Sequence, residues 1–132
     1  MSVGTRREAR ERALSLLYEA EAKALSGDAV LADLPLAADD FTVDLVSGVD
    51  RHREPIDELI RRFARDWTIE RMPVVDRNVL RLAIYELLDR PDIPTAAILS
   101  EAVELAKQYS TEDSGRFVNG VLASVATELR PG

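Results

Sequence analysis

Apolar residues recur at intervals of three and four along almost the whole chain, and this spacing restricts the fold more than any other feature. In residues 55–67, for example, the apolar stripe consists of Ile56, Leu59, Ile60, Phe63 and Trp67. No segment shows the strict alternation of a half-buried strand or the turn residues of a hairpin. The sequence therefore predicts an all-α protein.

Capping and helix-breaking residues divide this pattern into about seven helices. Thr5 and Glu8 have the spacing of a capping box, which starts a helix that runs to about Leu25 and ends at the glycine-containing turn of residues 26–28. Further helices are expected after Asp28, after Asp39 or Asp40, from Pro55, and over residues 73–88, 95–109 and 115–129.

Two of the expected helices carry information about packing. Residues 73–88 are apolar around most of the helix, so we expect this helix at the centre of the molecule. Gly120 lies inside the last helix, where glycine costs about 1 kcal/mol relative to alanine. We expect a close approach of another helix at Gly120, with backbone access for a ligand as the alternative.

The length and composition are those of one soluble globular domain covering residues 1–132. Hydrophobic residues make up 46% of the chain and charged residues 31%, which is an ordinary globular balance. The absence of cysteine excludes disulfides, thiolate nucleophiles and cysteine-bound metals. No apolar run is long enough to cross a bilayer and no signal-type segment follows the N-terminus, so the cytoplasm is the expected location.

The charge is distributed unevenly, although the net charge of −7 is acidic. Residues 1–12 carry four arginines against two glutamates, whereas residues 13–49 carry one lysine against seven acids. A short basic segment beside an acidic one indicates a local anion-binding patch on an acidic body.

Three of these arginines lie on the inner side of the first expected helix. Arg10 lies about 40° and Arg7 about 100° from Arg6 around the helix axis, on the side of the apolar stripe, whereas Arg12 falls on the opposite, solvated face. We infer that the helix start projects beyond the body, with its inner side open to a partner. Because cations in the first turn oppose the helix dipole, a bound anion would stabilise this arrangement. Nucleic-acid binding, pairing with the acidic segment and simple solvation all remain open.

A second candidate for RNA contact lies at the start of the last helix. Phe117 follows Arg116 and precedes Asn119 by two residues. An aromatic ring beside a cation and an amide suits the stacking and base-edge contacts of single-stranded RNA. The alternative is that Phe117 belongs to the core.

Catalytic and metal-binding candidates are few. The chain has one histidine, His52, which we interpret as a surface residue. The adjacent carboxylates Asp39-Asp40 and Glu112-Asp113 precede expected helices, where acids act as caps. We therefore expect neither an enzyme nor a metal or cofactor site.

Three stretches, in order along the chain, carry the motifs of one known family. They are RREARE at residues 6–11 with Ala13 and Leu17-Tyr18, VDR at 75–77 continuing through Leu80-Arg81 and Ala83 to YEL at 85–87, and IP at 93–94 with EAVELAK at 101–107 and FVNGVL at 117–122. Together they resemble the NusB family of bacterial transcription antitermination factors over essentially the whole chain.

The resemblance implies an all-α fold of two small three-helix bundles packed together and a non-enzymatic role. Members of the family pair with a small-subunit ribosomal protein, called NusE in this setting. The heterodimer binds boxA RNA in ribosomal RNA transcripts and acts in an RNA polymerase antitermination complex. These are the partners that the resemblance predicts for this chain.

The resemblance also assigns site residues by position. Those expected to face RNA are Arg6, Arg7, Arg10, Asp113, Arg116, Phe117 and Asn119. Those expected to contact the protein partner are Tyr18 and Asp76.

Two departures from the family pattern bear on RNA affinity. Glu8 stands where members often have a basic residue, and the chain ends at residues 130–132 without a basic tail. Both should weaken RNA binding by this subunit alone. A homodimer that covers the arginines, and a helical adaptor that binds only proteins, remain as alternatives.

Overall fold

The computed structural model describes residues 5–132, and over that range it contains seven α-helices, one short 3-10 helix and no strand. The elements are α1 (Arg6–Lys23), α2 (Gly27–Ala32), α3 (Asp40–Arg51), α4 (Arg53–Phe63), the 3-10 helix η1 (Ile69–Arg71), α5 (Val74–Asp89), α6 (Thr95–Tyr109) and α7 (Glu112–Leu129). The all-α prediction is confirmed. None of these helices combines the length and apolar character needed to span a membrane.

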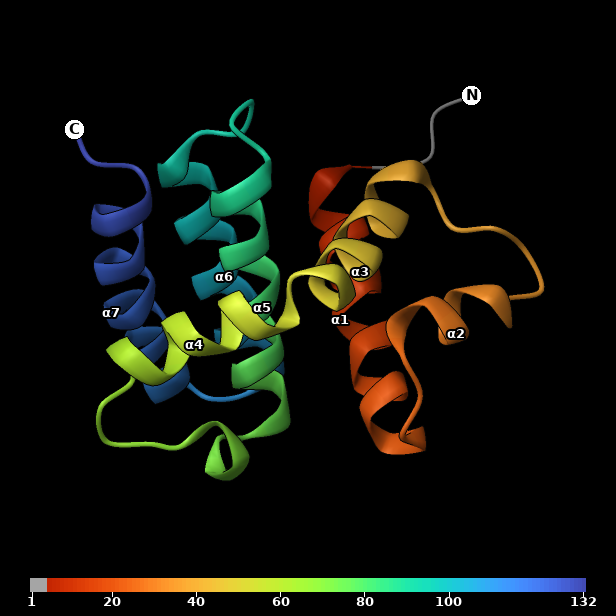
Figure 1. The fold of residues 1–132 in the computed structure, drawn as a ribbon, viewed down its shortest axis with the longest axis horizontal. Coiled ribbons are helices and arrows are strands. Elements are labelled where there is room, and N and C mark those ends of the chain that lie inside the picture. The colour runs from red at the N-terminus through yellow and green to blue at the C-terminus, as the bar shows by residue number, and fades with distance from the viewer. Residues whose placement is uncertain (1–4) are drawn as a thin grey trace.

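The helices form two groups that lie side by side (Figure 1). Helices α1, α2 and α3 make the N-terminal group, and α5, α6 and α7 make the C-terminal group, with α4 running from α3 across to α5 and α7. One continuous cluster of buried apolar side chains extends through both groups. The expected pair of three-helix bundles is therefore present, and α4 is the seventh helix that joins them.

The start of α1 follows the prediction, but its end does not. The capping box is present, because Thr5 Oγ1 accepts from the amide of Glu8 and the Glu8 carboxylate accepts from the amide of Thr5. At the other end Ala24 adopts the left-handed conformation (φ 55°), so the prediction that Gly27 ends this helix is wrong. Gly27 instead begins α2, where a Cβ would lie only 2.7 Å from Val46 Cγ1.

The helix expected from Pro55 is shorter than its apolar stripe. Asp39 caps α3 as predicted, but α4 begins at Arg53, directly after α3, and ends at Phe63. Trp67, counted in the stripe, lies outside the helix in the following loop and is 45% exposed. Its assignment to the buried stripe is therefore wrong.

Helix α7 begins three residues earlier than expected, at Glu112. The reason is that Thr111 Oγ1 accepts from the amide of Ser114, which makes Thr111 the cap. Asp113 and Arg116 consequently belong to the first turns of α7 rather than to a polar loop.

The predicted central position of residues 73–88 is confirmed, because α5 contacts five of the other helices. It also brings polar side chains into the interior, and each has a charged or polar partner. Arg81, for example, donates from Nε and Nη2 to the buried carboxylate of Asp57 on α4, at 2.9 and 3.0 Å. Burial of such ionised groups is tolerated only when they are paired.

Helix α3 approaches α5 closely at Gly48. A Cβ at this position would lie 2.2 Å from the ring of Tyr85 on α5. Tyr85 is only 2% exposed, and its hydroxyl donates to Asp44 at 2.6 Å, so the ring has little freedom to move away. Gly48 is thus required for α3 to pack against α5.

Gly120 behaves in the opposite way. A Cβ on Gly120 would meet nothing within 4 Å, and the residue is exposed. The expectation of a close helix approach at Gly120 is therefore wrong.

These two glycines give a matched test of the packing. Gly48→Ala should lower the free energy of unfolding by about 1–3 kcal/mol, because overpacking forces Tyr85 or the α3 backbone to shift. Gly120→Ala should raise it by up to about 1 kcal/mol, because alanine favours a helix interior. Urea denaturation of the two variants measures both, and a neutral Gly48→Ala would contradict the assigned contact.

Candidate nucleic-acid interface

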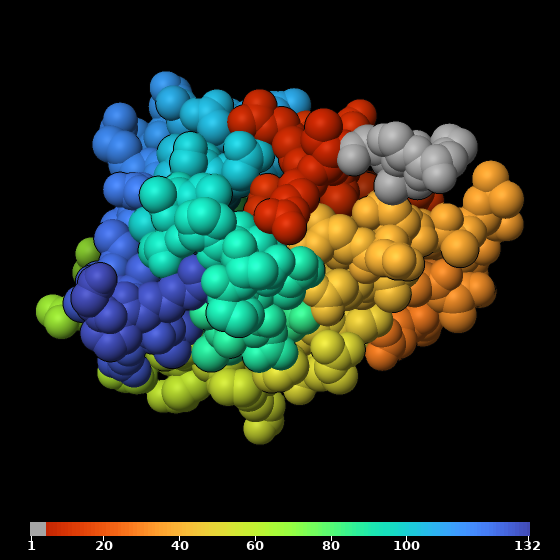
Figure 2. Space-filling model, turned by 90° about the horizontal axis from the view of Figure 1, so that it is seen from above, coloured from red at the N-terminus to blue at the C-terminus, as the bar shows by residue number. Residues whose placement is uncertain are grey.

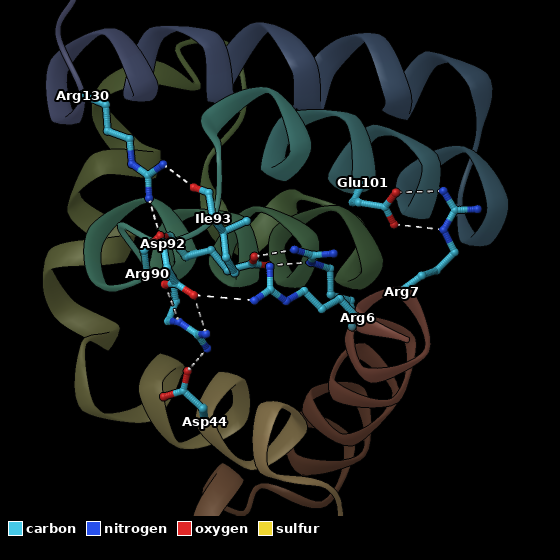
Figure 3. Close-up of polar contacts among 10 residues, drawn as sticks. Arg6, Arg7, Asp44, Arg90, Asp92, Ile93, Glu101 and Arg130 are labelled. Carbon is cyan, nitrogen blue, oxygen red and sulfur yellow. Dashed lines mark hydrogen bonds and ion pairs between the residues drawn. The ribbon is translucent and has the colours of Figure 1, made fainter. Parts of the chain in front are cut away.

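Two of the three predicted arginines make ion pairs at the surface with the C-terminal group (Figure 3). Arg7 donates from Nε and Nη2 to the two carboxylate oxygens of Glu101 on α6, at 2.9 and 2.8 Å. These hydrogen bonds hold the pKa of Glu101 below its ordinary value and raise that of Arg7. Arg6 lies 3.6 Å from Asp92 in the connector between α5 and α6. Neither acid belongs to the acidic segment of residues 13–49, so Arg6 and Arg7 do not pair with that segment.

The third arginine, Arg10, is buried. It is 5% exposed and donates from Nε and Nη2 to Glu86 of α5, at 2.8 and 2.7 Å. Phe41 of α3 covers the same guanidinium, with its ring centroid 5.5 Å away. The expectation that the inner side of the first helix lies open is therefore wrong at Arg10, because α3 and α5 close over the second turn of α1.

The first turn of α1 remains accessible. The side chains of Arg6 and Arg7 are 53% and 56% exposed. In the view from above, the start of α1 lies at the surface between the chain around α6 and that of α3 (Figure 2). Arg12 is exposed, in agreement with its predicted place on the solvated face.

A network of arginines holds the connector beside Arg6. Arg90 donates to both carboxylate oxygens of Asp92, and these hydrogen bonds keep the pKa of Asp92 below its ordinary value. Arg90 also donates to Asp44. Burial and the hydrogen bond to Asp44 raise the pKa of Tyr85 to about 12.

Arg130 donates to four backbone carbonyls at the end of α5 and in the connector, including that of Ile93 at 2.7 Å (Figure 3). The last arginine of the chain thus stabilises the connector internally.

The second predicted RNA element lies at the start of α7. Asp113 and Arg116 form an ion pair one turn apart, and their side chains are 84% and 77% exposed. Asn119 is exposed on the next turn. These three side chains are accessible to a ligand.

Phe117 belongs both to the core and to the surface. It packs against the buried cluster, and its ring centroid lies 5.9 Å from that of Trp67. The two rings line a cavity of about 360 Å³ together with Asp113 and Asp76. Sequence reasoning missed Trp67 as a member of this site, because its spacing fitted the apolar stripe of the preceding helix.

The two predicted partner-binding residues line neighbouring hollows. Tyr18 is 52% exposed and lies in a groove of about 380 Å³ with Tyr109 and Val75. Asp76, next to Val75 on α5, is 3% exposed and lines the cavity of Trp67 and Phe117. One oxygen of Asp76 accepts from Ser114 Oγ at 2.9 Å, and the other has no hydrogen-bond partner within residues 5–132.

Helix α6 connects the two predicted RNA elements. In the middle of α6 Glu101 pairs with Arg7, and at its end the hydroxyl of Tyr109 donates to Glu11 of α1 at 2.9 Å. From Glu101 to Tyr109 the helix rises about 12 Å, and α7 begins three residues later. Arg6 therefore lies beside the connector that precedes α6 and Arg7 beside its middle, whereas α7 starts just beyond its other end.

The residues considered for catalysis have structural contacts. Asp39 caps α3, and Glu112 and Asp113 lie in the first turn of α7. His52 is only partly exposed, with Nδ1 3.0 Å from the carbonyl of Gly48 and Nε2 3.3 Å from Asp89. Within residues 5–132 no group of three or more histidine or acidic side chains is arranged to hold a metal ion.

The buried Arg10–Glu86 pair leads to a stability prediction. Arg10→Met should lower the free energy of unfolding by about 3–5 kcal/mol, because it leaves the Glu86 carboxylate buried without a partner. The double variant Arg10→Met/Glu86→Leu should recover most of this loss. Urea denaturation measures both, and a single variant that unfolds like the wild type would argue against the pair.

Comparison with known proteins agrees with this geometry. The NusB family model matches residues 7–127. The transcription antitermination protein NusB of Acidothermus cellulolyticus is 52% identical over 91% of this chain and 86% of its own length. That of Saccharopolyspora erythraea is 50% identical over 94% of this chain and 88% of its own length.

Solved structures show the same fold. NusB of T. maritima matches with a TM-score of 0.86 and 37% identity, covering 96% of this chain and 94% of that one. A structure described as antitermination factors NusB and NusE in complex with dsRNA matches with a TM-score of 0.79 and 29% identity, covering 93% and 96%. The chain belongs to the NusB family, whose members named above are transcription antitermination proteins rather than enzymes.

Proposed function

We propose that this protein is a transcription antitermination factor that binds boxA RNA of ribosomal RNA transcripts as a heterodimer with the ribosomal protein NusE. The observation that carries the proposal is the pair of accessible, RNA-compatible elements that α6 connects. Arg6 and Arg7 pair with the connector before α6 and with its middle, and Arg116 and Phe117 lie in the helix that follows its end. The family relationship and the similar solved structure of NusB and NusE with dsRNA support the same conclusion.

Each element suits a different part of an RNA strand. The guanidinium groups of Arg6, Arg7 and Arg116 suit backbone phosphates. The rings of Phe117 and Trp67 suit an unstacked base, because stacking on aromatic side chains is the common way to hold single-stranded RNA. Arg10 takes a different role in this proposal: it fixes the start of α1 from inside and does not touch RNA.

Asp113 and Asn119 complete the second RNA element in this proposal. Both are exposed on the first turns of α7, beside Arg116 and Phe117. A carboxylate accepts and an amide both donates and accepts, so the two side chains suit the edges of bases rather than phosphates.

The partner protein would occupy the groove beside this RNA surface. Tyr18 and Tyr109 give the groove two exposed aromatic rings, and Glu11 gives it an acid. Exposed aromatic side chains of this kind are typical of protein interfaces. Asp76 would lie at the border between the partner and the RNA.

A basic partner would also offset the negative charge of the free chain, which by itself disfavours RNA binding. The net charge is −7, and Glu8 and Glu101 lie close to the RNA-facing arginines. A basic partner would supply the missing phosphate contacts. In this proposal the chain works as a single domain in the cytoplasm, within an RNA polymerase antitermination complex.

The salt dependence of RNA binding tests the role of α1. In a plot of log affinity against log salt concentration, three phosphate contacts from this chain should contribute about −2 to the slope, in addition to the contacts of the partner. Arg6→Ala/Arg7→Ala should bind more weakly and make the slope shallower by about 1.4, because two contacts are lost. The measurement is a titration of a boxA oligonucleotide with the heterodimer at several salt concentrations.

Arg12→Ala is the matched control, since it removes the same charge from the solvated face of the same helix. It should leave the slope unchanged. Equal slopes for the wild type and the double variant would overturn the RNA proposal. Sedimentation of the free chain in the same buffers tests the alternative of a homodimer that covers the arginines.

The partner groove has its own test. Tyr18→Ala should weaken binding of the ribosomal protein by about tenfold or more, because a central aromatic contact is lost. Leu36→Ala is the control, since Leu36 is 79% exposed and lies outside the groove. Calorimetric titration in the absence of RNA measures both, and equal affinities for the two variants would place the partner elsewhere.

A further inference from the structure

We propose that Glu101 is a positioning residue for RNA binding: it holds the guanidinium of Arg7 with its second edge directed outward, ready for a phosphate. The inference rests on the proposed RNA-binding function and deepens it. It assigns a binding role to an acidic side chain, which by charge alone would be expected to repel RNA.

The hydrogen bonds of Arg7 leave one edge of its guanidinium free. Glu101 accepts from Nε and Nη2, which form one edge of the planar group. A guanidinium has five N–H donors, so Nη1 and the second hydrogen of Nη2 remain for another acceptor. The Arg7 side chain is 56% exposed, whereas that of Glu101 is 21% exposed. The carboxylate is thus anchored against the body, and the free edge of the arginine faces solvent.

The environments of the other two arginines differ. Arg10 and Glu86 are both buried, so Arg10 has no edge available to a ligand. Arg6 lies 3.6 Å from Asp92, whose two oxygens already accept from Arg90, so Arg6 is only weakly held. Among these three arginines, Arg7 alone combines a two-bond anchor with an accessible edge.

Two opposing effects of Glu101 can be compared. Ordering a long, flexible side chain on binding lowers affinity by about two- to tenfold, and a side chain that is already held avoids most of this loss. Repulsion between the carboxylate and a phosphate on the opposite edge, at about 7 Å in water, lowers affinity by about two- to threefold. Screening at physiological salt, where the Debye length is about 8 Å, reduces this repulsion to about 1.5-fold. Positioning therefore outweighs repulsion at physiological salt.

The test compares two acids that each hold one arginine by two hydrogen bonds. Glu128 of α7 accepts from both terminal nitrogens of Arg62 on α4, at 2.6 Å each. It lies near the end of α7, about 24 Å along the helix from Glu112. Glu101→Ala and Glu128→Ala change the net charge equally. Their affinities for a boxA oligonucleotide are measured with the heterodimer at several salt concentrations, beside Arg7→Ala and Arg7→Ala/Glu101→Ala.

Glu101→Ala should bind RNA about three- to fivefold more weakly than Glu128→Ala. Its salt slope should equal that of the wild type, because Arg7 still reaches the phosphate, whereas Arg7→Ala should lose about 0.7 of slope. In the Arg7→Ala background, removal of Glu101 should not weaken binding further. A purely structural effect would weaken binding in that background too, and thermal unfolding of each variant checks this independently.

Contrary outcomes are distinguishable. Tighter binding by Glu101→Ala than by Glu128→Ala would make Glu101 a competitor of the phosphate and overturn the positioning role, as would equal binding. If Arg7→Ala itself binds with the wild-type affinity and slope, Arg7 is not an RNA contact. That result would remove the inference together with this part of the proposed function.

Discussion

The buried ion pair between Arg10 and Glu86 joins the first helix to the central helix, and the arrangement of the surface depends on it. The two side chains are 5% and 1% exposed. Either charge would be strongly unfavourable in the interior without the other, so the pair fixes both the rotation and the axial position of α1 against α5. Gly48, which lets the Tyr85 ring pack against α3, completes the contact between the two groups of helices.

Once α1 is fixed in this way, the burial of the three arginines on its inner side follows from the helical turn in which each lies. Arg10 is in the second turn and is enclosed, whereas Arg6 and Arg7 are in the first turn and reach the rim. The ring of Phe41 lies close to the guanidinium groups of both Arg6 and Arg10, at 5.7 and 5.5 Å, and so contributes cation–π stabilisation at the boundary between core and surface. One short basic segment thus supplies both a structural anchor and a binding surface.

Sequence signals predicted those features of the helices that depend only on residues close together in the chain. The capping box at Thr5 and Glu8, the Asp39 cap and the central position of α5 are examples, because capping and apolar periodicity involve residues within a turn or two of each other. Helix ends were less predictable. Trp67 fitted the periodicity of α4 but lies beyond its end against Phe117, a residue fifty positions away, and no local signal reports such a contact.

For the candidate site too, features set by local sequence were predictable and features set by distant contacts were not. The sequence by itself determined that the protein is all-helical, that basic residues gather at its beginning, and, through motifs spread along the chain, its family. Only the tertiary structure decided that Arg10 is enclosed while Arg6 and Arg7 are accessible, and that Glu101 is the partner of Arg7. The physical reason is that burial and ion pairing depend on side chains from distant helices, such as Glu86 and Glu101, which helical periodicity within one segment does not describe.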